Sequence, residues 1–201
     1  MLAGSLLCGH AAGAAGPAIV VLGDSLSSGY GLDGAPSWVT LLEHRLAEQG
    51  FEYEVVNASI AGDTSAGGLS RLPRLLETYA PAIVVVELGG NDGLRGQPVA
   101  SLRSNLVAML EMIAANGAQA VLAGIQIPPN YGPQYTQQFT GLYASLAEEF
   151  EIPFIEFFMD GVALNAQLMQ RDRTHPNADG QPILLDNVWP VLQALLQQKI
   201  G

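Results

Sequence analysis

Five short runs of almost wholly apolar residues recur along this chain, and longer segments separate them. A strand with one face in water alternates apolar and polar residues, whereas a strand buried on both faces is apolar throughout. Runs of the second kind indicate a parallel sheet that helices cover on both sides. The runs are residues 18–22, 53–56, 83–88, 120–125 and 154–157. This pattern predicts a doubly wound α/β domain with a parallel sheet of about five strands.

The segments between the runs carry apolar residues at helical spacing. Residues 38–46 form one such stripe, with Ser37 placed as an N-cap and Gly50 just past the end. The other stretches with this period are residues 102–113, 135–150 and 179–198. Pro182 and Pro190 interrupt the last stretch, so we expect this helix to be kinked or to start late.

The first 16 residues, MLAGSLLCGHAAGAAG, are small and apolar and include no charged side chain. They look like the back half of a secretory signal without its positive segment. We therefore expect residues 1–16 to be a signal-peptide remnant, residues 17–201 to be a single domain, and the protein to be periplasmic or secreted. Cys8, the only cysteine, lies in this segment. The mature chain then has no cysteine for a disulfide, a thiol nucleophile or a metal site.

Charge and hydropathy exclude several kinds of partner. Eight Lys and Arg residues against 19 Asp and Glu residues give a formal net charge of −11, and such a surface repels the phosphates of nucleic acids. Beyond the first 16 residues, no apolar run approaches the roughly 20 residues that a membrane span needs. We expect a small-molecule substrate, no nucleic acid and no stable membrane insertion. The sequence leaves the oligomeric state open, and a monomer is one of the states it allows.

The stretch GDSLSSGYGLDG, which follows the first run, supports two interpretations. Its later glycines, Gly29, Gly31 and Gly34, have the spacing of a dinucleotide-binding turn. That turn should follow the strand directly, but Gly29 comes six residues after Gly23. The start of the stretch instead places Ser25 at the carboxyl edge of the sheet, where such folds bind their ligands. Serine is also a common turn residue, so this position alone does not assign a nucleophile.

Two further strand ends offer groups that can donate to a negative charge. Gly62 follows the second run, and because it has no Cβ its backbone N–H can approach a ligand closely. Asn91 follows the third run, in the loop GGNDG, where its amide can donate to a developing oxyanion. Both residues also suit ordinary turns.

The segment DRTHPN near the C-terminus offers a general base. Asp172 and His175 are three residues apart, so the carboxylate can accept from one imidazole nitrogen while the other faces a substrate. Of the other histidines, His10 lies in the expected signal segment and His44 on the polar side of a helix. Each strand-end segment is a weak signal alone. Together with Ser25 they supply the nucleophile, acid, base and donors of an acyl-transfer site.

These motifs resemble those of the SGNH hydrolases, also called GDSL esterases, and most closely their bacterial periplasmic branch of thioesterase, protease, lysophospholipase and arylesterase enzymes. The matching motifs are VLGDSLSSGYG, VVNASIAGDTSAGGLSRLP, VVVELGGNDGLRG, IPPNYGPQY, PFIEFFMDGV and DRTHPNADGQP. They run in the family's order from about residue 18 to about residue 190. The resemblance implies a flavodoxin-like three-layer αβα sandwich.

The resemblance also implies a site. Ser25 would be the nucleophile, and Asp172 and His175 would complete the catalytic triad. The oxyanion hole would consist of the backbone N–H of Ser25, the backbone N–H of Gly62 and the side chain of Asn91. No metal and no organic cofactor is implied.

The implied reaction is the hydrolysis of carboxylic esters and acyl thioesters through an acyl-enzyme. Two alternatives remain open: an acetyl-ester or carbohydrate esterase of the same mechanism, and a non-catalytic binding module of the same fold. Apolar residues in 125–131 and 157–169 suggest an acyl-binding groove, although such residues are also typical of a core.

Overall fold

The computed structural model describes residues 16–198, so residues 1–15 of the expected signal segment lie outside the described residues. The strands are β1 (Ala18–Gly23), β2 (Glu54–Asn57), β3 (Ile83–Glu87), β4 (Gln119–Ala123) and β5 (Phe154–Ile155). The helices are α1 (Trp38–Glu48), α2 (Ser65–Tyr79), α3 (Gly90–Leu94), α4 (Val99–Ala115), α5 (Pro133–Glu149) and α6 (Gln181–Gln198), with short 3₁₀ helices η1 (Pro129–Tyr131) and η2 (Ala178–Gly180).

All strand pairs are parallel, and the order across the sheet is β2-β1-β3-β4-β5. The chain leaves β1 for one neighbour, β2, and then crosses back to the other neighbour, β3. The register pairs Val21 with Asn57 and Gly23 with Glu87, so the carboxyl ends of these three strands lie together. Open parallel sheets bind their ligands at such a reversal of strand order.

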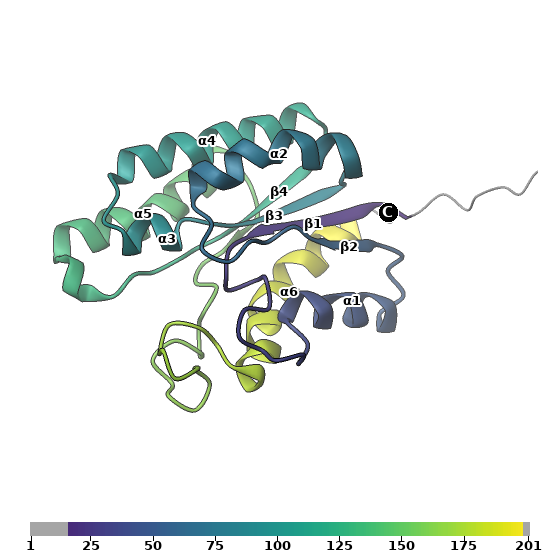
Figure 1. Ribbon diagram of the computed structural model, residues 1–201. Coiled ribbons are helices and arrows are strands. Elements are labelled where there is room, and N and C mark those ends of the chain that lie inside the picture. The colour runs from purple at the N-terminus through teal and green to yellow at the C-terminus, as the bar shows by residue number, and fades with distance from the viewer. Residues whose placement is uncertain (1–15, 199–201) are drawn as a thin grey trace, which may run out of the picture.

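Helices cover the sheet on both faces, with α1 and α6 on one side and α2, α4 and α5 on the other (Figure 1). The two faces of β1 show why its sequence is apolar throughout. Val20 and Leu22 pack into the core beneath α2 and α4, whereas Ile19 and Val21 pack into the core beneath α1 and α6. The predicted three-layer α/β sandwich with five parallel strands is confirmed. Within residues 16–198, no helix is long and apolar enough to cross a membrane.

The expected helices are present with small changes in their limits. Ser37 is the N-cap of α1, and its Oγ accepts a hydrogen bond from the Thr40 N–H at 3.3 Å. The last helix does start late, because η2 precedes α6 and Pro182 occupies its second position. Pro190 lies inside α6.

Two helices were not predicted from the periodicity. In α2, two glycines near the start and Pro73 weaken the helical pattern. Gly68 is nevertheless buried against Leu88, and a Cβ at this position would lie only 2.2 Å from the Leu88 side chain. The segment expected to be a loop after β3 is mostly the short helix α3. Glycine disfavours helices, but here tertiary packing overrides that preference.

Candidate active site

The structure brings together the three residues that the sequence singled out for nucleophilic chemistry. The Ser25 Oγ and His175 Nε2 atoms are 2.9 Å apart, and His175 Nδ1 lies 2.7 Å from Asp172 Oδ2. Ser25 stands two residues after β1, whereas the other two residues come from the loop between β5 and α6. A serine, an imidazole and a carboxylate are thus linked in the order that a charge-assisted general base requires.

The loop around Asp172 holds its carboxylate ionised. Asp172 Oδ1 accepts hydrogen bonds from the backbone N–H groups of Thr174 and His175, at 2.9 and 3.1 Å. The hydrogen bond from the Thr174 N–H has the largest effect on the pKa of Asp172, and the one from the His175 side chain comes next. Together they lower this pKa to about 2. The ionised carboxylate can only accept, so it selects the tautomer with the proton on His175 Nδ1. His175 Nε2 then faces Ser25 as a proton acceptor.

Two residues that the sequence analysis did not select contact this base. The Tyr30 ring packs on the His175 ring, with centroids 4.6 Å apart and planes tilted by 49°. Gln170 Nε2 donates to the carbonyls of Tyr30 and Pro176, at 2.9 and 3.0 Å. Gln170 therefore ties the loop after the nucleophile to the loop that carries the base. No motif spacing signals this contact, because Tyr30 and Gln170 are 140 residues apart.

Two backbone amides near Ser25 are available to a ligand. Within residues 16–198, neither the N–H of Ser25 nor the N–H of Gly62 donates a hydrogen bond. Gly62 has a φ of 80°, a left-handed conformation that favours glycine, and the space where a Cβ would lie is empty. Both residues were expected to provide oxyanion donors, and the geometry leaves both groups free for that role.

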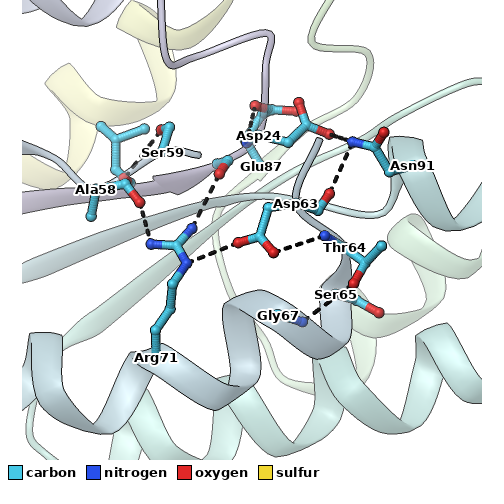
Figure 2. Close-up of polar contacts among 12 residues, drawn as sticks. Asp24, Ala58, Ser59, Asp63, Thr64, Ser65, Gly67, Arg71, Glu87 and Asn91 are labelled. Atoms are coloured by element: carbon cyan, nitrogen blue, oxygen red, sulfur yellow. Dashed lines mark hydrogen bonds and ion pairs between the residues drawn. The ribbon is translucent and has the colours of Figure 1, made fainter. Parts of the chain in front are cut away.

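Asn91, the third expected donor, lies in the first turn of α3 beside the same strand ends. Its Nδ2 donates to Asp24 Oδ2 at 3.0 Å and to the Asp63 carbonyl at 2.9 Å (Figure 2). An amide nitrogen carries two hydrogens, so both already have acceptors. A substrate oxygen would have to share one of them. These two contacts also fix the direction in which the amide points.

A buried pair of acidic residues lies beneath the nucleophile, and the sequence analysis did not identify it. Glu87 is fully buried, and its Oε2 accepts from the Ser27 Oγ at 2.7 Å. Its Oε1 has no hydrogen-bond partner within residues 16–198. Burial, with the nearby charge of Asp24, raises the pKa of Glu87 well above its ordinary value. Burial also raises the pKa of Asp24 to about 6.

The apolar stretches that suggested an acyl groove contribute mainly to the core. Ile125, Ile127, Phe158 and Val162 are buried, whereas Leu164 is fully exposed. An open depression of about 540 Å³ lies at the start of α5, and its lining comes from residues 131–135 and 138. None of these lining residues belongs to the Ser25, His175 and Asp172 cluster.

The structure can be compared with two kinds of cofactor site, a dinucleotide-binding turn and a metal site. The glycines of the possible dinucleotide turn lie in an irregular segment, and α1 begins only at Trp38, 15 residues after the end of β1 at Gly23. A dinucleotide turn instead leads directly from strand to helix. Among residues 16–198, no three His, Cys, Asp or Glu side chains are grouped so that they could hold a metal ion.

Comparison with known proteins gives a consistent result. Residues 21–183 match the GDSL-like Lipase/Acylhydrolase family. The chain is 51% identical over 183 residues to Esterase TesA of Pseudomonas aeruginosa, a match that covers 91% of each chain. It is 44% identical over 183 residues to Thioesterase 1/protease 1/lysophospholipase L1 of Escherichia coli K12, covering 91% of this chain and 86% of that protein.

Solved structures show the same similarity in three dimensions. The crystal structure of TesA matches with a TM-score of 0.86 and covers 89% of this chain and 99% of its own. The psychrotrophic esterase EstA from Pseudoalteromonas sp., inhibited by monoethylphosphonate, is 41% identical and matches with a TM-score of 0.85. That match covers 90% of this chain and 98% of the EstA chain.

Proposed function

This chain belongs to the GDSL-like lipase/acylhydrolase family and is a serine hydrolase of esters, and we propose that Ser25 is its nucleophile, with His175 as base and Asp172 as the orienting acid. The observation that carries this assignment is the continuous contact from Ser25 Oγ through His175 to the Asp172 carboxylate. The chain also matches 91% and 86% of the length of two enzymes named for esterase and thioesterase activity, which supports both classes of substrate.

The proposed reaction proceeds in two passes. His175 Nε2 takes the hydroxyl proton of Ser25 as Oγ attacks the carbonyl carbon of the ester or thioester. The tetrahedral intermediate collapses, and the alcohol or thiol leaves with the proton from His175. A water molecule then loses a proton to His175 as its oxygen attacks the carbonyl carbon of the acyl-enzyme. The bond from this carbon to Ser25 Oγ breaks, His175 returns the proton to Oγ, and the acid is released. Asp172 stays ionised throughout and stabilises the imidazolium.

The negative oxygen of each tetrahedral intermediate requires donors that are already in place. We assign this role to the backbone N–H groups of Ser25 and Gly62 and to the Asn91 side chain. The two backbone groups have no competing acceptor within residues 16–198. Both Nδ2 hydrogens of Asn91 already have acceptors, Asp24 and the Asp63 carbonyl, so the oxyanion would share one of these hydrogens with its present acceptor. The chemistry assigned to these residues needs no metal or organic cofactor.

For the acyl group, we propose that medium or long chains are hydrolysed faster than acetate. The exposed apolar side chains near the site support this proposal, because Tyr30 contacts His175 and Ile60 stands two residues before Gly62. A strong preference for acetyl esters would instead favour the acetyl-ester or carbohydrate esterase alternative. We further propose that the protein acts outside the cytoplasm, periplasmic or secreted, on small-molecule substrates and without nucleic acid.

The decisive experiment is intact-mass analysis after treatment with a fluorophosphonate, on the wild type and on Ser25→Ala in parallel. One adduct on the wild type and none on the variant is the expected result, since the reagent requires an activated serine. EstA, which carries a phosphonate in its solved structure, provides a precedent in a relative. A folded wild type without an adduct would contradict the proposal and favour the binding-module alternative.

A further inference from the structure

Arg71 is a partly buried residue of α2 whose guanidinium reaches three separate acceptors (Figure 2). Its Nε donates to Asp63 Oδ2 at 2.8 Å, and one terminal nitrogen, Nη2, donates to the Gly23 carbonyl at 3.2 Å. The other, Nη1, donates to the carbonyl of Ala58. Gly23 ends β1, and the other two acceptors follow β2. One side chain therefore ties two strand ends to α2.

These strand ends carry the groups assigned above to the oxyanion hole. Gly62 directly precedes Asp63, and Ser25 stands two residues after Gly23. The backbone carbonyl of Asp63 accepts the Asn91 Nδ2 hydrogen bond at 2.9 Å. A displacement of Asp63 would therefore move the Gly62 N–H and the Asn91 amide together.

Asp63 is held on both carboxylate oxygens. Oδ2 contacts Arg71, and Oδ1 accepts from the Thr64 N–H at 3.0 Å. The Arg71 and Asp63 side chains are only 21% and 12% exposed, whereas the other two arginine–carboxylate pairs within residues 16–198 have side chains between 28% and 61% exposed. Lower exposure reduces screening by water. The Arg71–Asp63 pair is thus the best placed of the three to hold a fixed geometry.

We propose that Arg71 is a positioning residue for the oxyanion hole. It acts through Asp63 and through the carbonyls of Gly23 and Ala58, and it touches no reacting atom. The inference rests on the proposed function, because it requires the groups around Ser25 to stabilise an oxyanion. Donors that interact more strongly in the transition state than with bound substrate govern kcat. Loss of Arg71 should therefore lower kcat and leave KM nearly unchanged.

The test compares Arg71→Ala and Arg71→Lys with Arg74→Ala, a control that removes an exposed arginine from the same helix. Each protein is labelled to completion with a fluorophosphonate to count working sites, and kcat per labelled site and KM are measured on one ester. We expect Arg71→Ala to lower kcat per site by about 10- to 100-fold, the size that small misplacements of reacting groups produce. Arg71→Lys should recover part of the lost kcat, because lysine keeps a positive charge. The recovery should be incomplete, because an ammonium lacks the planar fork of donors. Arg74→Ala should match the wild type.

The count of labelled sites separates positioning from a purely structural role. If Arg71→Ala lowers only the number of labelled sites or the melting temperature, and kcat per site stays at the wild-type value, the proposal is wrong. A second measurement places the Arg71 substitution in an Asn91→Ala background, where its effect on kcat should shrink by about threefold or more because the two residues act on one assembly. If kcat of the double variant instead falls by the product of the two single-variant factors, Arg71 does not act through Asn91.

These outcomes are distinct from a failure of the proposed function. A wild type that takes no label, or a Ser25→Ala variant that keeps full hydrolytic activity, would remove the assigned oxyanion hole itself. A labelled Ser25 together with an Arg71→Ala variant of unchanged kcat per site would remove only the role of Arg71.

Discussion

Glu87 occupies a fully buried position at the end of β3, where a carboxyl group is rare. Its Oε2 belongs to a chain of hydrogen bonds in which the Trp38 indole donates to Ser27 and Ser27 donates to Glu87, at 3.0 and 2.7 Å. The raised pKa means that the folded protein keeps a proton on this group to higher pH than an ordinary glutamate does. Burial thus favours the neutral acid at this position, and its Oε2 accepts hydrogen bonds from the Ser27 hydroxyl and the Asp24 N–H in the turn that leads from β1 to Ser25.

This protonation predicts a pH dependence of stability. In the unfolded chain Glu87 loses its proton near its ordinary pKa of 4.5, whereas the folded protein retains it up to the raised value. The unfolded state then binds fewer protons, so this group makes stability fall as pH rises above 4.5, by at most about 1.4 kcal/mol per pH unit. Glu87→Gln has no such proton. The stability of the wild type relative to this variant, measured by urea unfolding, should therefore decline as the pH rises above about 5.

The matched control for this measurement is Glu77→Gln, which removes an exposed carboxylate on α2. Its stability should follow the wild-type curve at every pH. Asp24 is present in all three proteins and lies beside Glu87, so the difference between the wild type and Glu87→Gln reports on this acidic pair together. Parallel curves for the wild type and Glu87→Gln would show that Glu87 ionises alike in the folded and unfolded states.

At the scale of a single element, α3 is held by packing rather than by propensity. Asp92 is buried and accepts hydrogen bonds from the backbone N–H and the Oγ of Ser65, at 2.9 and 2.5 Å. Gly93 lies against Ile127 and Phe139, so close that a Cβ would be 2.7 Å from either side chain. The helix that carries Asn91 is thus fixed on one side to the start of α2 and on the other to the core beneath α5.

This packing predicts opposite effects for two glycine substitutions in helices. Gly93→Ala should destabilise the protein by about 1–3 kcal/mol, because the added methyl group overpacks the core. Gly141→Ala on α5 meets no atom within 4 Å, so it should stabilise by about 0.5–1 kcal/mol through helix propensity. Chemical denaturation measures both free energies. A stabilising Gly93→Ala would mean that α3 is free to move away from the core.

At the scale of the whole molecule, β1 connects the two cores and the site. It pairs with β2 on one edge and β3 on the other, and its two faces supply both hydrophobic cores. Contacts of this strand begin at its first residues, because the Pro17 carbonyl accepts from the Glu54 N–H and the Ala18 carbonyl from the Ala82 N–H. The strand ends at Gly23, directly before the turn that carries Ser25.

The domain limits expected from the sequence can be tested by shortening the chain. A protein that begins at Pro17 should keep its activity and melt within about 2 °C of the full chain, since a larger shift would need close to 1 kcal/mol. A protein that begins at Val20 loses Ala18 and the fully buried Ile19 and should be less stable by about 2–5 kcal/mol or fail to fold. If the chain from Pro17 were much less stable, residues 1–16 would belong to the folded domain.

Much of the fold and of the site was predictable because it depends on local pattern. The all-apolar strand runs specify a parallel sheet, and Ser37 and Gly50 mark the ends of α1. The family motifs pointed to Ser25, Asp172 and His175, and their side chains meet in the structure. Their catalytic roles await the labelling experiment.

The sequence by itself determined the fold class and the residue types at the strand ends, because burial on two faces and the chemistry of short motifs are local properties. Only the tertiary structure decided which distant groups meet. It buried Glu87 beside Asp24, folded α3 against its glycine preference, and placed Arg71 under two strand ends. The physical reason is that packing and solvent exclusion act between segments far apart in the chain, and no local pattern records those distances or the pKa shifts that follow from them.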